Sequence, residues 1–330
     1  MMLSELLYNS KIKEEFLDNY PSNSMHMYES LFLRSSSTES KLKKDIFDFN
    51  EMEIVSFFKN LGMRYKSTAR SYGRILTIYI DFAIKNNYKK NNNNPLRIET
   101  TKWFENFVDD SVNVFFNISE LEIIEQHCVN PQDAVIFRLL FEGVQGKACS
   151  ELRNLKKSDI NYEDEELTLT DADGSTRILG VTTECLELID EAIEQTIYYK
   201  SNGQMQEREN IRNYTDLIYS EFVIRSSNTG KNKIVGAVDR NVIYRRISTI
   251  EKTYGDMNPS ASERLNAKNI SRSGMIFYAQ DIMRFDNITL RSEIMKRVSK
   301  KFNISPYILG EFITERNISR LYNNFNEWGE

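Results

Sequence analysis

The chain has few residues of the kinds on which most enzyme centres depend. Its 330 residues include only two histidines, His26 and His127, and three widely spaced cysteines, Cys128, Cys149 and Cys185. Two isolated histidines argue against a zinc site and against a histidine-based catalytic triad. An odd number of cysteines without a C-x-x-C pair favours buried, unreactive thiols over a disulfide framework. We therefore expect neither a metal nor a cofactor.

Glycine, proline and long apolar runs are also scarce. Only 13 glycines and 5 prolines are present, which favours a mostly helical fold with few tight turns. No apolar run approaches the length of a membrane-spanning helix, and the initial segment MMLSELLYNSKIKEEF is too polar for a signal peptide. With 40% hydrophobic and 28% charged residues, the composition is typical of a soluble protein large enough for two domains. A cytoplasmic protein without membrane partners is expected.

The net charge of −5 does not by itself indicate nucleic acid, but the distribution of charge does. Residues 41–100 contain 12 Lys/Arg and 6 Asp/Glu, residues 101–200 contain 8 and 21, and residues 201–330 contain 20 and 15. Two basic parts therefore flank an acidic one. This distribution is expected if one face of each basic part meets phosphate.

The N-terminal part has the pattern of successive helices. Apolar residues at helical spacing predict helices within 4–34, and the polar run SSSTES at 35–40 predicts a break. A helix is expected from about Glu51 to Leu61, and Gly62 would follow in the usual C-terminal capping role.

A longer helix is expected from Ser67, a favourable N-cap, to about Asn87. The run NNNNP at 91–95 then ends this unit and begins a linker. Over residues 40–97, the short helix, the S-x-x-T segment, the aromatic-rich helix and the N-N-P together resemble the core-binding domain of tyrosine recombinases, the phage integrase family.

A second resemblance to this family lies between Ala134 and Val181. The segment GKACSEL at 146–152, followed by Leu155 and by SDI at 158–160, resembles the first signature box, G-L-R-x-S-E-L-x-x-L-x-x-x-D-I. In the family, the arginine of this box grips the scissile phosphate. Alignment on SEL puts Ala148 at the arginine position, and alignment on GVQ at 143–145 puts Gln145 there.

The rest of the chain agrees with a mainly helical domain that contains one small sheet. Ser119 is a candidate N-cap, and strands at 167–170 and 177–180 alternate about the turn DADG at 171–174. Further helices are predicted at about 183–200, 208–219, 239–254, 267–280, 288–300 and 305–321, with loops at 201–210 and 226–236.

The resemblance implies a fold class and a domain division. The fold would be mainly α (α+β), with an N-terminal helical, SAM-like core-binding domain and an integrase catalytic-like domain that has one small antiparallel sheet. The predicted boundaries are 1–100 for the first domain, 101–116 for a linker and 117–330 for the second.

Most positions that the family uses for catalysis are substituted here. The hairpin lysine would fall near Thr170–Gly174, where two carboxylates stand, and Arg177 matches a strand position that usually carries a nonessential basic residue. The second box resembles NISRS at 269–273, which keeps Arg272 but has Asn269 in place of a histidine. The third box has Glu311 in place of a histidine, and Tyr322 falls at the position of the nucleophile.

The intact catalytic set is therefore absent, and its remnants are Arg272 and Tyr322. Each has a second interpretation. A tyrosine can stand at position 322 for packing alone, in a chain with 17 tyrosines. Arg272 is either a retained phosphate contact or the partner of Glu311 or another acid. Loss of one preorganised donor costs on the order of 10² to 10³ in rate, so we expect no enzymatic activity.

The expected function is that of a catalytically inactive integrase-fold protein that binds double-stranded DNA operator sites in a sequence-specific way. Together with the Asn- and Lys-rich composition, the pattern resembles the integrase-like master repressors of lysogeny in SPβ-type Bacillus phages, which implies a nucleoid-associated prophage repressor in a bacterial host. The candidate DNA contacts are basic or hydroxyl side chains: Lys66, Ser67, Thr68, Arg70, Arg74, Lys231, Lys233, Arg240, Arg245, Arg246, Lys268 and Arg272.

Two other functions stay open from the sequence. The first is an active recombinase in which Lys147 or Arg153 replaces the missing arginine and Tyr322 is the nucleophile. The second is an interaction protein that does not bind DNA. Possible partners also include a second copy held through Phe325 and Trp328 of the C-terminal tail, and an antagonist protein or a peptide-signalling component.

Overall fold

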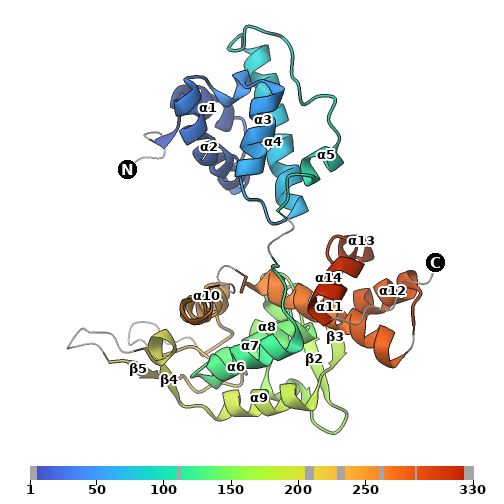
Figure 1. The fold of residues 1–330 in the computed structure, drawn as a ribbon. Coiled ribbons are helices and arrows are strands. Elements are labelled where there is room, and N and C mark those ends of the chain that lie inside the picture. Colours follow the sequence, from blue (N-terminus) through green and yellow to red (C-terminus); the bar gives the residue numbers. More distant parts are fainter. Residues whose placement is uncertain are drawn as a thin grey trace. The chain divides into compact units, whose positions relative to one another are not determined.

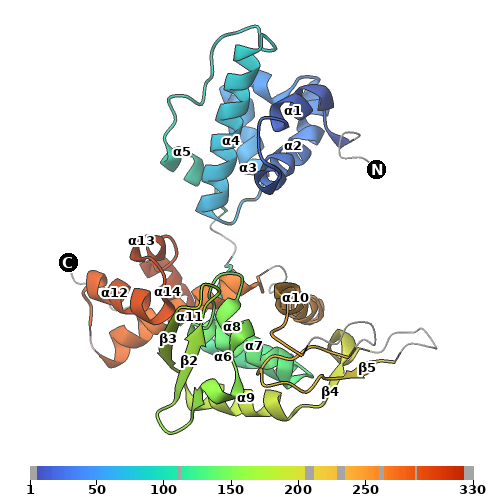
Figure 2. The same cartoon turned by 180° about the vertical axis from the view of Figure 1, so that it is seen from behind.

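A computed structural model describes residues 6–109, 113–204, 212–228, 235–259, 264–286 and 288–322, without the side chains of 22–24. The chain divides into two compact units, Met1–Asn113 and Val114–Glu330 (Figures 1 and 2). Within the described residues, no helix is both long and apolar enough to cross a membrane.

Unit 1 is helical, as the sequence predicts. Its elements are α1 (Ser10–Leu17), α2 (Ser22–Leu42), the 3-10 turn η2 (Ile46–Asp48), α3 (Glu51–Asn60), α4 (Lys66–Lys85) and α5 (Thr101–Glu105). Asn50 and Glu53 form a capping box at the start of α3. After α3, Gly62 adopts the left-handed conformation with φ of 58°, which confirms its predicted capping role. Tyr65, and not Ser67, precedes the first turn of α4.

The predicted break at 35–40 is wrong, because α2 continues through it. Polar side chains of this segment form hydrogen bonds and an ion pair inside the unit. Glu39 is fully buried and accepts from the Lys13 ammonium at 2.7 Å and from the Ser35 hydroxyl at 2.9 Å. Asp45 lies 3.4 Å from the same ammonium. A polar run can thus continue a helix when its residues complete a buried ion network.

The segment predicted as a linker, 101–116, contains a helix. Helix α5 falls inside it and lies beside α4 (Figure 1). The ring of Phe104 packs so closely over Gly73 that a Cβ there would clash, and it also contacts Phe58. Residues up to Asn113 therefore belong to unit 1.

Unit 2 surrounds α7 with helices and places a small sheet against α8. Its first elements are α6 (Ile118–His127), α7 (Pro131–Glu142), α8 (Ser150–Asn154), η3 (Lys157–Asp159), β1 (Ile160–Asn161), β2 (Glu166–Thr170), β3 (Thr176–Gly180) and α9 (Thr183–Glu194). The elements that follow are β4 (Ile197–Tyr199), η4 (Lys200–Gly203), β5 (Tyr214–Asp216), α10 (Arg240–Met257), α11 (Ala267–Phe285), α12 (Arg291–Phe302), α13 (Pro306–Leu309) and α14 (Glu315–Tyr322).

The predicted hairpin is confirmed as β2 and β3, which pair antiparallel with Leu167 opposite Leu179. Strand β1 adds to the other edge of β2. Leu167, Leu169 and Leu179 are buried, so one face of the sheet closes the core. The fold class, mainly helical with a small antiparallel sheet, is confirmed.

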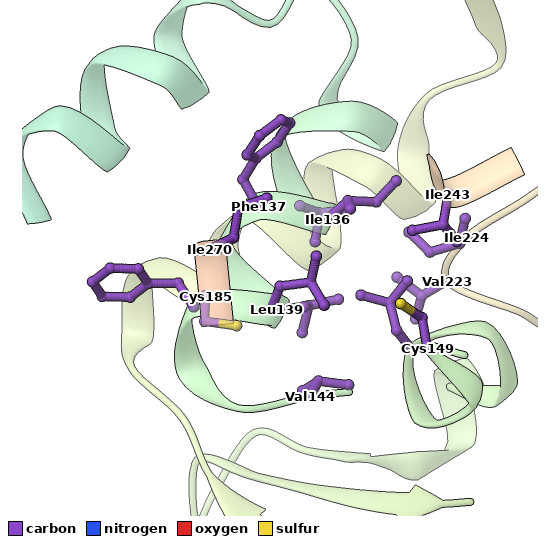
Figure 3. Packing of buried hydrophobic residues seen from close by; sticks show 14 of the residues in the cluster. Ile136, Phe137, Leu139, Val144, Cys149, Cys185, Val223, Ile224, Ile243 and Ile270 are labelled. Atoms are coloured by element: carbon purple, nitrogen blue, oxygen red, sulfur yellow. The ribbon is translucent and has the colours of Figure 1, made fainter. Parts of the chain in front are cut away.

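Helix α7 is the centre of unit 2. All its residues from Gln132 to Glu142 are buried, and Gly143 ends it with φ of 117°. Helix α11 crosses α7 so closely that a Cβ at Gly274 would overlap the Phe141 carbonyl oxygen. Figure 3 shows Ile136 and Leu139 of α7 among the other side chains of this core.

Several predicted boundaries in unit 2 are corrected. The helix expected at 183–200 ends at Glu194, and β5 occupies 214–216 inside the helix expected at 208–219. Strands β4 and β5 pair with each other, so pairing outweighs the helical pattern. They lie at the end of the unit opposite α12–α14 in both views (Figures 1 and 2). Asn117, and not Ser119, caps α6, through the backbone N–H of Glu120.

Candidate nucleic-acid interface

The loop that resembles the first signature box is organised around an aspartate. Ala148 and Cys149 both adopt the left-handed conformation, with φ of 55° and 58°. The carboxylate of Asp171 accepts from the backbone N–H of Lys147 at 3.1 Å and from the hydroxyl of Ser150. The bond from Ser150 is the main reason that the pKa of Asp171 is lowered. One of the two positions that the resemblance offers for the family's arginine therefore holds an alanine, and the segment where it expects the lysine holds an ionised aspartate.

Arg177 on β3 is a structural residue. Its guanidinium binds both carboxylate oxygens of Glu151, at 2.6 and 2.8 Å, and donates to the carbonyl oxygens of Gly143 and Lys301. Gln145, the other candidate for the first arginine position, donates its side-chain amide to the carbonyl oxygen of Phe302. These contacts join α7, α8, β3 and α12.

Asn269 on α11, which replaces the first histidine of the second box, is fully buried. Its side-chain amide donates to the backbone carbonyl oxygen of Arg264 at 2.8 Å, and its backbone carbonyl oxygen accepts from the Ser273 hydroxyl at 2.7 Å. The Ser273 hydroxyl also accepts from the backbone N–H of Phe116. The hydrogen bonds of Asn269 and Ser273 together hold the start of α11 in place.

Arg272, the retained arginine, has an anionic neighbour from the third box. Its Nη2 lies 3.8 Å from Oε2 of Glu311, and its guanidinium stacks 4.5 Å from the centre of the Phe312 ring. Lys268 lies within the field of both charged groups, since burial and Arg272 lower the pKa of Lys268 while Glu311 raises it. The pairing of Arg272 with Glu311, one of the two interpretations from the sequence, is observed.

Tyr322 at the end of α14 lies in a different environment. It lines a hollow of about 210 Å³ with Ile118, Phe277, Gln280, Met283, Arg284 and Ile318, a set that does not include Arg272. The hydroxyl is buried and has no regular hydrogen bond within the described part of the chain. Burial raises the pKa of Tyr322 and outweighs the opposite effect of the Ile118 backbone. A protonated, buried phenol is a poor nucleophile.

The DNA-contact candidates of unit 1 lie together on the first turns of α4: Lys66, Ser67, Thr68, Arg70 and Arg74. Lys66 and Arg70 share one carboxylate, that of Glu105, at 3.5 and 3.0 Å. Arg74 is exposed one turn further along the helix. Two cations with one carboxylate, followed by an exposed arginine, leave this surface basic.

In unit 2, the structure exposes Arg240 and Arg245 on α10 and Lys268 on α11. Arg153, the alternative to the missing arginine, has a buried Nε without a hydrogen-bond partner among the described residues. Lys147 is exposed. The predicted contacts Lys231 and Lys233, and Phe325 and Trp328 of the tail, lie outside the described residues.

Arg246 is buried, which argues against the prediction that it contacts DNA. Its side chain is 5% exposed and lies 3.5 Å from the carboxylate of Asp133. It donates to the carbonyl oxygens of Gln132 and Arg225 at 3.2 and 2.7 Å, and it stacks over the ring of Tyr198. The guanidinium therefore ties α10 to α7. No local pattern in the sequence predicts this burial, because a basic residue on a helix is usually exposed to solvent.

Both units match models of one protein family. Residues 7–85 match the model described as MrpR, N-terminal core-binding domain, and residues 115–323 match MrpR, C-terminal catalytic domain. The chain belongs to the MrpR family. The predicted division into core-binding-like and catalytic-like parts agrees with these matches.

A curated relative and solved structures extend this result. The chain is 28% identical over 327 residues to the SPbeta prophage-derived uncharacterized protein YopR of Bacillus subtilis (strain 168), which covers 96% of this chain and 97% of the relative. The structure of a lambda integrase(75-356) dimer bound to a COC' core site matches with a TM-score of 0.52 at 12% identity, covering 96% of this chain and 98% of that one. A second lambda integrase dimer on the same kind of site has a TM-score of 0.52 at 11% identity and covers 96% and 80%. The predicted tyrosine recombinase fold and the relation to SPβ are confirmed.

Proposed function

We propose that this protein is a catalytically inactive, integrase-fold regulator that binds double-stranded DNA operator sites sequence-specifically and represses transcription to maintain lysogeny of a prophage. The observation that carries the proposal is the state of the retained arginine. Arg272 is paired with Glu311, while an ionised aspartate, Asp171, stands where the family's lysine would donate a proton.

The chemistry of strand cleavage explains why these substitutions matter. Negative charge grows on the phosphate as the tyrosine attacks, so preorganised cationic donors are needed around it. At the other positions that the resemblance assigns, the structure holds Ala148, Asn269 and Glu311, none of which supplies a cation. Each lost donor costs on the order of 10² to 10³ in rate, so combined losses reduce turnover to a negligible level.

The residues that support binding to DNA are not those at the family's catalytic positions. Exposed basic side chains lie on α4 of unit 1 and on α10 of unit 2. The lambda integrase structures with the same fold are described as bound to a core site. The relation to an SPbeta prophage protein supports the prophage setting.

A nicked suicide duplex carrying the chain's own operator tests the proposal. Genomic footprinting would first identify that operator as a repeat shared by the bound promoters. We expect the wild-type protein to hold the duplex and to form no covalent adduct, and Tyr322→Phe to behave in the same way. An adduct that disappears in Tyr322→Phe would contradict the inactive function, and a chain that holds no duplex would contradict the DNA-binding function.

One observation favours an active recombinase as the second candidate. Arg153 follows the substituted loop, and its Nε is buried and lacks a hydrogen-bond partner among the described residues. A guanidinium held in this way could turn toward a phosphate. The suicide-duplex experiment with Arg153→Lys distinguishes the two candidate functions. An active recombinase would form an adduct as wild type and lose it in this variant.

Association with other molecules is a further part of the proposal. A repressor must be released, and an antagonist protein or a peptide-signalling component would do this by binding the folded chain. Self-association through the C-terminal tail would let two copies occupy repeated half-sites. Sedimentation of the full chain and of a chain truncated after Tyr322 tests the second point.

A further inference from the structure

The arginine retained on α11 is held by an anion from its own chain. Arg272 has only 10% of its side chain exposed, and it lies between the carboxylate of Glu311, at 3.8 Å, and the face of Phe312, at 4.5 Å. Glu311 itself is 26% exposed. The stacking fixes the plane of the guanidinium.

A second cation belongs to the same cluster. Lys268 lies one helical turn before Arg272 on α11, a spacing that puts both side chains on one face. Burial and Arg272 lower the pKa of Lys268 while Glu311 raises it, so Lys268 lies within electrostatic range of both groups. Beside the same segment, Arg291 approaches Gly310, the residue before Glu311. The carboxylate of Glu311 thus pairs with Arg272 and lies within electrostatic range of Lys268.

We propose that Glu311 acts as an internal substitute for phosphate: it occupies the anion site formed by Lys268 and Arg272 and keeps the DNA backbone from binding there. The inference rests on the proposed DNA-binding function and deepens it. Carboxylate and phosphate oxygens compete for the same guanidinium donors. A tethered carboxylate competes at a high effective concentration, on the order of millimolar or more, which a phosphate in solution must exceed.

This arrangement makes Glu311 a residue that limits the affinity for duplex DNA of any sequence. Contacts to phosphate carry no sequence information, and they strengthen binding to every duplex alike. Without Glu311, the buried Arg272 beside the exposed Lys268 would therefore strengthen binding to operator and non-specific DNA by a similar factor. With Glu311 in place, affinity for every duplex depends on contacts elsewhere in the protein.

Inorganic phosphate provides a test that needs no operator. The thermal midpoint of the full chain is measured while phosphate replaces chloride at constant ionic strength. We expect wild type to respond weakly and Glu311→Gln to bind phosphate about tenfold more tightly, as removal of a competing charge-assisted contact allows. Glu311→Ala should show the same gain. Glu315→Gln is the matched control, because it removes one exposed carboxylate four residues away on α14.

Every outcome of this titration is informative. A gain in both Glu311 variants that is absent from Glu315→Gln, and that is lost in Arg272→Ala/Glu311→Gln, supports the inference. No gain, an equal gain in Glu315→Gln, or wild type that binds phosphate as tightly as Glu311→Gln overturns it.

Binding to a duplex of random sequence provides a second test. There, Glu311→Gln should bind more tightly than wild type, and its salt slope should steepen by about 0.9, the value for one additional phosphate. The two proposals can fail separately. A wild-type chain that holds no duplex contradicts the proposed function, whereas the phosphate titration still decides the role of Glu311.

Discussion

At the scale of single residues, burial separates the structural cations from those that can meet a ligand. Lys13 and Arg246 are 0% and 5% exposed and have carboxylate partners inside their units. Arg74 and Arg245 are exposed on helices. Removal of a buried cation leaves its carboxylate partner buried without a compensating charge. Removal of an exposed cation changes mainly the electrostatic field at the surface.

Lys13→Met tests the structural class. Its ammonium serves two buried carboxylates, Glu39 and Asp45, so the variant should destabilise unit 1 by about 3–5 kcal/mol. Denaturant unfolding followed by the fluorescence of Trp103, in a Trp328→Phe background, reports on this unit. Lys11→Met is the control, because Lys11 is exposed and should change little. Equal effects of the two variants would contradict the buried network.

The same network predicts a dependence on pH. Burial, opposed in part by Lys13, raises the pKa of Glu39 from 4.5 to about 7. The folded state therefore holds a proton that the unfolded state releases between these values, and the stability of unit 1 should fall as the pH rises from about 4.5 to about 7. Glu39→Gln removes the titrating group, so its stability should be flatter across that range. An unchanged slope in the variant would show that Glu39 is not responsible.

At the scale of elements, the contact of α7 with α11 depends on one glycine. A side chain at Gly274 would meet the backbone of Phe141, which cannot rotate away. Gly274→Ala should therefore destabilise unit 2 by about 1–3 kcal/mol or more, as overpacked cores do. Gly180→Ala, where a Cβ meets nothing within 4 Å, should have little effect. Thermal unfolding followed by circular dichroism compares the two, and equal midpoints would argue against the tight crossing.

The elements that the sequence predicts correctly are those whose signals are local. The hairpin at β2 and β3 is specified by alternation and by the turn at 171–174, and the end of α3 is specified by Gly62. The wrong predictions fall on segments whose structure depends on a partner that is distant in the sequence. Strands β4 and β5 form because they pair with each other across a long connection, and α2 continues past Ser35 because Lys13 reaches Glu39.

The candidate site follows the same division. Substitutions at Ala148, Asn269 and Glu311 can be read from motif spacing, because each motif is a local run of residues. The pairing of Arg272 with Glu311 could be named only as one of two alternatives, since 38 intervening residues separate the partners. The burial of Arg246 could not be predicted, because Asp133 lies on a helix more than a hundred residues earlier.

At the scale of the whole molecule, the acidic and basic parts of the chain correspond to different surfaces. Acidic side chains gather along the groove between α6, α7 and α9, which is lined by Glu122, Glu184, Glu187 and Glu191 among others. The exposed arginines of α4 and α10 belong to the basic parts at either side of it in the sequence. A net charge of −5 is therefore compatible with binding to DNA, because local fields and not the total decide.

If both units contact one duplex, their contributions to salt dependence should add. Arg74→Ala in unit 1 and Arg240→Ala in unit 2 should each reduce the slope of log K against log salt by about 0.9, and the double variant by about 1.8. The loss should be similar for operator and random sequence, because phosphate contacts do not read bases.

The matched control is Arg297→Ala, which removes an arginine paired with Asp286 and Glu293 on and near α12 and should leave the slope unchanged. Gel shifts at several salt concentrations measure all four proteins alongside wild type. A double variant with the slope of either single variant would mean that only one unit meets the DNA. In that case the exposed cations of the other unit would contact only water, because surface cations without a phosphate partner leave the salt slope unchanged.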